Sequence, residues 1–255
     1  EIGDGVDPSR LGQRVAIETI GDGRACGSCW FCRSGQYKQC LNQFPVEGGG
    51  FAEYIKRRDF GCYPVPDTLS WESAALVEPL AVSIHGVRRG NLQGGETVAI
   101  LGSGNIGLTS VAAARAMGAG KIFVTARHKQ QASMALSLGA DVAVSSEGPA
   151  LKDALADATN GRGADLTIET VGGKSDATLK QAVAVTRMQG RIVILGGFRV
   201  PLVFEWLTPL LREQSIIFSS CYGIINGYHD YEVAIELMAT GRVFLDQMVT
   251  HRYPL

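Results

Sequence analysis

The sequence has no long hydrophobic run and almost no net charge. Its longest apolar stretches, such as 98–101 and 192–195, fall far short of the ~18 residues that suggest a membrane span. Lysine and arginine number 24 against 25 aspartates and glutamates, which argues against a nucleic acid or an anionic membrane as the main partner. The first residues lack the basic start and apolar core of a signal peptide. We therefore expect a soluble, cytoplasmic protein.

Glycine, in contrast, is abundant, with 32 of 255 residues against a usual ~7%. No collagen-like period accompanies it, so the excess predicts tight turns and close backbone approaches. The apolar fraction of 45% with 19% charged residues excludes a disordered chain. The length allows one large domain or two ordinary ones, and such a chain needs no disulfide staples.

Four of the six cysteines, Cys26, Cys29, Cys32 and Cys40, lie within one short window, separated by two, two and seven residues. Four thiolates on a loop of small and polar residues can converge on one tetrahedral ion, which favours a structural zinc site. Two local disulfides and an iron–sulfur cluster remain alternatives. The ferredoxin pattern has a shorter last gap and a proline after the fourth cysteine, where this chain has Leu41. Cys62 and Cys221 stand alone and are interpreted as small buried residues.

The organisation changes along the chain. Residues 1–70 are predicted to be rich in short strands and loops, with extended runs at 14–19, 51–57 and 62–66. From residue 97 onward, strands and alanine-rich helices alternate, as in a parallel sheet covered on both faces. The strands are expected at 97–101, 121–126, 142–145, 164–169, 191–196 and 215–219, and the helices at 106–117, 129–138, 149–158, 175–187 and 229–240.

A glycine motif, Gly102-Ser-Gly104-Asn-Ile-Gly107, follows the first of these strands and opens a helix. In this context Gly102 permits the tight turn, Gly104 lets backbone approach a pyrophosphate, and Gly107 allows close packing of helix on strand. The helix N-terminus supplies N–H groups to the phosphates. The motif predicts a dinucleotide site, and an ordinary glycine-rich turn without a ligand is the alternative.

The next strand indicates which dinucleotide binds. An NAD site normally has a carboxylate about 20 residues after the glycines, on the ribose 2′-hydroxyl. Residues 121–131 contain no Asp or Glu, and Ala126 is followed by Arg127 and Lys129. Arg127 offers a charged planar fork to a 2′-phosphate, so NADP(H) is favoured over NAD(H). A solvated basic face at the helix start is the alternative.

Glu78 stands among apolar residues, just before Pro79. An unpaired buried carboxylate is costly, so Glu78 is expected to be hydrogen-bonded, ion-paired or near a metal. A first-turn acid that interacts with the helix dipole carries equal weight. His85 is interpreted as a packing histidine rather than a ligand, and Asp165 as structural at a strand start.

These features in this order resemble the zinc-dependent medium-chain dehydrogenase/reductase family, in the polyol, sugar and threonine dehydrogenase branch. The motifs that carry the resemblance are GQRVAIE (12–18), the cysteine window, GGFAEY (49–54), VPDTLS (65–70), EPLAVSIH (78–85), VAILGSGNIGL (98–108), GADLTIETVG (163–172) and GGF (196–198). The resemblance implies that Glu78 is a catalytic-zinc ligand or a carboxylate close to that zinc. Glycine motif and resemblance together give as cofactor-binding residues Gly102, Gly104, Asn105, Ile106, Gly107, Ala126, Arg127, Lys129, Leu195, Gly196, Gly197, Ser219, Ser220 and Cys221.

One departure is that the family's catalytic zinc also needs a Cys and a Gly-His-Glu segment, and no such segment occurs here. The resemblance therefore implies a fragment that lacks the N-terminal catalytic-zinc segment and is inactive by itself.

The fold class predicted is α/β. A partial GroES-like β domain with the structural zinc lobe (1–82, returning at 223–255) joins a doubly wound Rossmann domain (83–222). The predicted activity is hydride transfer between NADP(H) and a small secondary alcohol, such as a polyol, sugar or amino alcohol, or its ketone. Family resemblance implies a homodimer or homotetramer. A non-catalytic NADPH- and zinc-binding protein is the competing hypothesis.

Overall fold

The computed structural model describes residues 1–18, 22–45 and 49–255, which form two compact units. The first unit contains Glu1–Ala81, Cys221–Arg242 and Val249–Leu255, and the second contains Val82–Ser220 and Val243–Met248. Of the helices described, none is long and apolar enough to cross a membrane.

The second unit is built on a six-stranded parallel sheet in the order β5-β4-β3-β6-β7-β8. Successive strands move outward from β3 in one direction and from β6 in the other, which confirms the doubly wound Rossmann arrangement. Its strands are β3 (Thr97–Leu101), β4 (Lys121–Ala126), β5 (Val142–Ser145), β6 (Ala164–Glu169), β7 (Thr186–Ile194) and β8 (Ser215–Phe218).

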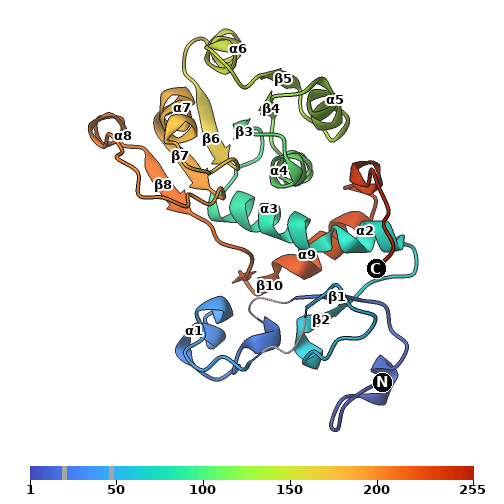
Figure 1. Ribbon diagram of the computed structural model, residues 1–255. Coiled ribbons are helices and arrows are strands. Elements are labelled where there is room, and N and C mark those ends of the chain that lie inside the picture. The colour runs from blue at the N-terminus through green and yellow to red at the C-terminus, as the bar shows by residue number, and fades with distance from the viewer. Residues whose placement is uncertain (19–21, 46–48) are drawn as a thin grey trace. The chain divides into compact units, whose positions relative to one another are not determined.

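Helices cover both faces of this sheet, with α6 and α7 on one side and α4 and α5 on the other (Figure 1). Because neither face meets water, every residue of β3 and of β6 is buried, and the strands are continuous apolar runs rather than alternating ones. The helices are α3 (Val77–Arg89, entering this unit at Val82), α4 (Asn105–Ala116), α5 (Lys129–Ser137), α6 (Ala150–Thr159), α7 (Ala177–Val185) and α8 (Leu207–Leu211).

One predicted boundary in this unit is wrong. The helix expected over 175–187 ends at Val185, because Thr186 already starts β7, five residues before the predicted strand start at 191. Thr186 pairs with Ala164, and after a register shift Arg191 pairs with Leu166. The intervening Gln189 adopts φ +56°, a conformation for which its side chain gives no local signal.

The first unit has short elements. Strands β1 (Val15–Ile17) and β2 (Cys62–Pro64) pair antiparallel, as do β9 (Ile224–Ile225) and β10 (Tyr228–His229). Its α-helices are α1 (Trp30–Arg33), α2 (Trp71–Ala75), the first turn of α3 and α9 (Asp230–Ala239). Its 3₁₀ turns are η1 (Pro8–Arg10), η2 (Asp22–Arg24), η3 (Tyr37–Gln39) and η4 (Asp59–Gly61), while η5 (Asp246–Met248) belongs to the second unit.

The expectation of a strand-rich 1–70 segment is therefore wrong in part. The run predicted at 14–19 is a strand at Val15–Ile17, and its last residue lies outside the described residues. The run at 51–57 forms no strand, and Phe51 and Tyr54 are 99% and 91% exposed. A strand exists only where a neighbour accepts its backbone hydrogen bonds, which the period of one segment cannot reveal.

Candidate functional site

The glycine turn after β3 has the geometry that the sequence predicts. Gly102 adopts φ +95°, and a Cβ on Gly107 would lie 2.1 Å from the Gly102 carbonyl oxygen. At Gly104, in contrast, no atom of the chain lies within 4 Å of a built Cβ. Gly102 and Gly107 are thus required by the conformation and packing of the chain itself, whereas the space next to Gly104 is open.

An open groove of about 710 Å³ begins at this turn and runs along the carboxyl ends of the strands. In this groove, the Thr125 hydroxyl on β4 accepts the Gly102 N–H at 2.8 Å and so connects β4 to the glycine turn. Gly104 occupies the N-cap of α4 without a side-chain cap, so no side chain of the cap competes for the first-turn N–H groups. The groove is lined by Gly102, Ser103, Gly104, Thr125, Arg127, Gln131, Ser146, Glu147, Gly148, Thr170, Val171, Ala177, Thr178 and Gln181.

The predicted basic residues lie at the end of β4. Arg127 lines the groove and is exposed, and Lys129 is the exposed first residue of α5. Ala126 is buried at the end of the strand. The sequence analysis missed Glu147, which enters the groove from the turn after β5. The sequence around Glu147 does not predict this position, because only the pairing of β5 with β4 brings Glu147 to the groove.

The other predicted cofactor residues are distributed over three places. Asn105, Ile106 and Gly107 form the first turn of α4. Leu195, Gly196 and Gly197 follow β7, and Ser219 and Ser220 follow β8. None of these residues lines the groove itself. Cys221 belongs to the first unit.

Glu169, at the end of β6, links two of the loops at this edge and was not predicted to have that role. It is fully buried, and one carboxylate oxygen accepts the N–H groups of Val171 and Gly172 at 2.9 and 2.8 Å. Its backbone carbonyl accepts the N–H groups of Leu195 and Gly196. Glu169 therefore fixes the loop after β6, which lines the groove, relative to the loop after β7.

The four cysteines predicted to bind metal come together in the first unit. Their sulfur atoms all lie within 4.8 Å of one another, with Cys29 and Cys32 3.4 Å apart and Cys26 and Cys32 3.9 Å apart. A tetrahedral zinc with Zn–S bonds of about 2.3 Å keeps its sulfurs about 3.8 Å apart. All six cysteines are free thiols, so the disulfide alternative finds no support, and the spacing fits a single ion.

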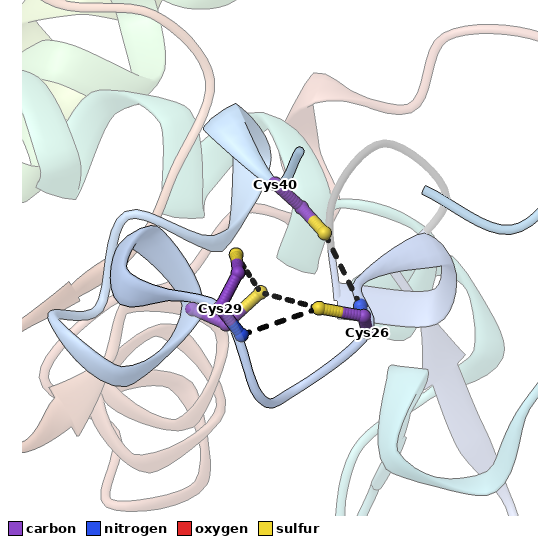
Figure 2. A group of neighbouring side chains, drawn as sticks. Cys26, Cys29 and Cys40 are labelled. Atoms are coloured by element: carbon purple, nitrogen blue, oxygen red, sulfur yellow. Dashed lines mark hydrogen bonds between the residues drawn. The ribbon is translucent and has the colours of Figure 1, made fainter. Parts of the chain in front are cut away.

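Backbone N–H groups donate to the sulfurs of Cys26 and Cys40, as Figure 2 shows. The Cys26 sulfur accepts the Cys29 N–H, and the Cys40 sulfur accepts the Cys26 N–H, both at 3.3 Å. The Ser28 hydroxyl, together with the N–H groups of Ser28 and Cys29, lowers the pKa of Cys26 to about 5. Burial raises the pKa of Cys32 to about 12, so a bound cation is needed to make all four sulfurs thiolates.

Glu78 lies in the first turn of α3 and is partly buried. Burial raises its pKa, and the negative charge of Glu18 raises it further. Glu18 itself is fully buried and accepts the Gly23 N–H at 3.2 Å. Two neighbouring carboxylates in partly apolar surroundings favour a bound cation or proton.

Two buried tyrosines, which the sequence analysis missed, lie near these carboxylates. Burial raises the pKa of Tyr222, as do Tyr231 and the charges of Glu18 and Glu78. Among the residues that the structure describes, the Tyr222 hydroxyl has no hydrogen-bond partner.

The four cysteines are the one group of three or more metal-ligand side chains found in the described ranges. Glu78 by itself therefore does not make a complete metal site.

Comparison with known proteins identifies the family. The family model described as zinc-binding dehydrogenase matches residues 105–240, which include α4 to α9 and the groove residues from Thr125 onward. The chain belongs to the zinc-binding dehydrogenase family. A second model, the alcohol dehydrogenase GroES-like domain, matches residues 1–67 of the dehydrogenase, including the cysteine cluster. The resemblance to the alcohol and polyol dehydrogenases is thereby confirmed.

Individual relatives of the dehydrogenase extend over its whole length. It is 37% identical to the sorbitol dehydrogenase of Bacillus subtilis, with all of this chain and 70% of the relative covered. Galactitol-1-phosphate dehydrogenase from Escherichia coli has a similar structure (TM-score 0.85, 25% identity, 98% of this chain and 73% of that one). A zinc-binding dehydrogenase from Sinorhizobium meliloti 1021 bound to NADP is also similar (TM-score 0.81, 32% identity, 97% and 72% covered).

Proposed function

We propose that this dehydrogenase transfers hydride between NADP(H) and a polyol or a related secondary alcohol. The observation that carries the proposal is the groove that begins at the glycine turn and contains Arg127, with no carboxylate on β4. The sorbitol dehydrogenase relative supports a polyol substrate, and the NADP bound to the S. meliloti protein supports the cofactor.

In this proposal the pyrophosphate lies against Gly104 and the first turn of α4, where free N–H groups and the helix dipole favour an anion. Arg127, with Lys129 near it, holds the 2′-phosphate. The nicotinamide lies near Ile106, the loop at Leu195–Gly197 and the residues Ser219–Cys221. These residues bind and orient the cofactor, which is the protein's part in hydride transfer.

The four cysteines are proposed to hold a structural zinc, and Glu78 to contribute to the catalytic one. A catalytic zinc, when bound, supplies a Lewis acid that lowers the pKa of an alcohol hydroxyl. The described residues bring one carboxylate, Glu78, and the charge of Glu18 to that place. Their contribution is negative charge in a partly buried setting, which attracts the cation.

The cofactor assignment is tested by Arg127→Ala, with Arg33→Ala, an exposed arginine of α1, as matched control. Loss of a charge-assisted contact to phosphate, about 1.5–3 kcal/mol, weakens NADPH binding by roughly 10- to 100-fold. We expect NADH binding by Arg127→Ala, and binding of both cofactors by Arg33→Ala, to be unchanged. Cofactor titrations followed by reduced-nicotinamide fluorescence measure this, and equal losses for NADPH and NADH would contradict a 2′-phosphate site at Arg127.

The catalytic assignment is tested by Glu78→Gln in an assay of NADP⁺ reduction by polyols. We expect activity to fall at least about 100-fold while NADPH affinity stays within a factor of two. If the wild-type protein binds NADPH and zinc but no alcohol supports reduction, the competing hypothesis of a non-catalytic binding protein is the better one.

We also propose that the dehydrogenase self-associates through β8, one of the two edge strands of the sheet. An edge strand presents unpaired N–H and C=O groups, which a second copy can pair about a two-fold axis. Phe218 on this strand and Leu210 and Leu211 beside it are about 70% exposed. Phe218→Lys is expected to convert a dimer to a monomer in light scattering, whereas Leu136→Lys on α5 has no effect. An unchanged mass for Phe218→Lys would contradict the interface.

A further inference from the structure

The cysteine lobe (residues 25–42) contacts the segment that leads into α9 at two points, all within the first unit. At the first, the Ile224 N–H donates to the Gly35 carbonyl at 3.1 Å. Gly35 has φ +79°, and a Cβ there would lie 2.6 Å from the Ile224 carbonyl oxygen. At the second, the Tyr37 hydroxyl is hydrogen-bonded to Nε2 of His229. Tyr37 lies between the ligand positions Cys32 and Cys40, so the cysteine cluster and the start of α9 are directly connected.

His229 has a defined protonation state in this arrangement. His229 is the N-cap residue of α9, and its ring Nδ1 accepts the Tyr231 backbone N–H at 3.0 Å. The backbone N–H of His229 donates to the Glu232 carboxylate at 3.1 Å. A neutral imidazole whose Nδ1 accepts carries its proton on Nε2. Nε2–H therefore donates to the Tyr37 oxygen. Both side chains are buried, at 3% and 2% exposure, so the donor has no access to water if Tyr37 is lost.

Aromatic contacts continue from His229 toward the carboxylates. Its ring stacks between Tyr37, at a centroid distance of 5.3 Å, and Tyr63, at 4.6 Å. The Tyr231 ring lies 5.1 Å from the Tyr63 ring and 4.9 Å from the Tyr222 ring between centroids, and it packs edge to face on Tyr222. The Tyr231 hydroxyl donates to the Ile17 carbonyl at 3.3 Å, immediately before Glu18.

This chain of contacts ends at Ile17, the residue before the fully buried Glu18. The charges of Glu18 and Glu78 raise the pKa values of both Tyr222 and Tyr231. Because Tyr231 lies in the first turn of α9 and packs on Tyr63 and Tyr222, a displacement of the α9 N-terminus changes the packing of these tyrosines.

We propose that Tyr37 and His229 are positioning residues that transmit occupancy of the four-cysteine metal site to the start of α9 and to Tyr231 and Tyr222, which pack there. With metal bound, the lobe holds Tyr37 against His229, and His229 fixes the start of α9 and thereby Tyr231 and Tyr222. Without metal, the lobe releases Tyr37 and the α9 N-terminus loosens. The inference rests on the proposed metal site in the cysteine lobe.

Hydrogen–deuterium exchange of the intact protein, before and after zinc removal by a chelator, tests this coupling. In the wild type we expect zinc removal to speed exchange in the lobe and also, by about tenfold, in residues 229–234. Removal of one partner of a buried hydrogen bond costs about 1–3 kcal/mol, which corresponds to a factor of roughly 5–150. In Tyr37→Phe, exchange at 229–234 is already fast with zinc bound and changes less than twofold on chelation, although zinc content is unchanged.

His229→Asn separates the two roles of the histidine. Asparagine still accepts as an N-cap but cannot reach Tyr37, so exchange at 229–234 is expected to be the same with and without zinc. Tyr54→Phe, at an exposed tyrosine, is the control for loss of a hydroxyl and retains the wild-type response.

The outcomes are distinguishable. A lobe that binds zinc while α9 fails to respond to its removal overturns the coupling alone, as does a full response in Tyr37→Phe. A lobe that binds no zinc by metal analysis overturns the metal site and with it the coupling.

Discussion

The cysteine lobe and the parallel sheet achieve order in different ways. The buried cluster of the lobe consists of Ala25, Tyr37 and Cys40, with the other three cysteines packed against it, so its core is largely the ligand set itself. The sheet buries aliphatic side chains under its helices, as where Leu101 and Ile192 of the strands cluster with Leu155 of α6. With the proposed zinc bound, a segment with so little apolar surface gains its folding energy from the ion, whereas the sheet gains it from packing.

The largest test of this contrast is removal of one lobe ligand. Cys29→Ser is expected to lose one zinc per chain and to raise amide exchange over residues 25–42 by at least about 100-fold, because structural zinc sites contribute roughly 10 kcal/mol. Peptides from β3 and β6 remain protected. Metal analysis and hydrogen exchange measure both effects. Cys62→Ser, at a thiol outside the cluster, is the matched control, and loss of protection in β3 would refute the independence of the sheet.

A pair of glycine variants sharpens the contrast within the sheet unit. Gly107→Ala places a Cβ 2.1 Å from the Gly102 carbonyl oxygen, so it is expected to destabilise the unit by about 1–3 kcal/mol and to weaken cofactor binding. Gly104→Ala meets no atom of the chain and is expected to keep wild-type stability while lowering NADPH affinity at least about tenfold. Denaturant titration and cofactor titration separate the two. Equal stability losses would show that Gly104 is structural too.

The smallest effect is a pH dependence at the start of β6. Burial opposes ionisation of Asp165, but the Thr97 N–H and the guanidinium groups of Arg187 and Arg162 hold the pKa of Asp165 below its usual value. Because its pKa is lower in the folded state, the Asp165 carboxylate stabilises the fold fully at pH values above its unfolded pKa of about 3.9. This stabilisation is lost as the pH falls below that value and through the folded-state pKa.

Asp165→Asn is therefore expected to lower the free energy of unfolding at pH 7 by about 1–3 kcal/mol. The difference from wild type shrinks below about pH 4. Asp157→Asn, an exposed carboxylate on α6, is the control. Urea titrations across pH measure it, and a pH-independent difference would mean that ionisation of Asp165 does not contribute.

Local pattern predicted most of the sheet unit, because its strands are continuous apolar runs and its helices carry their own start and stop signals. The glycine turn could be predicted for the same reason, since the positive φ of Gly102 and the close approach of Gly107 to the Gly102 carbonyl oxygen are local features. Glu147 and Glu169 could not, because their roles depend on strand pairing and on loops distant in sequence. Tyr231 and His229 likewise acquire their surroundings from residues 17, 37 and 63, and no periodicity predicts such contacts.

By itself, the sequence determined the alternating strands and helices of the sheet unit, the glycine turn and the four-cysteine cluster, since each depends on a pattern within a short segment. Only the tertiary structure decided where β7 begins, which carboxylates face the groove, and that the cysteine lobe contacts the start of α9. Those outcomes depend on backbone and side-chain partners far apart along the chain. Burial and hydrogen bonding select such partners only after the segments have packed.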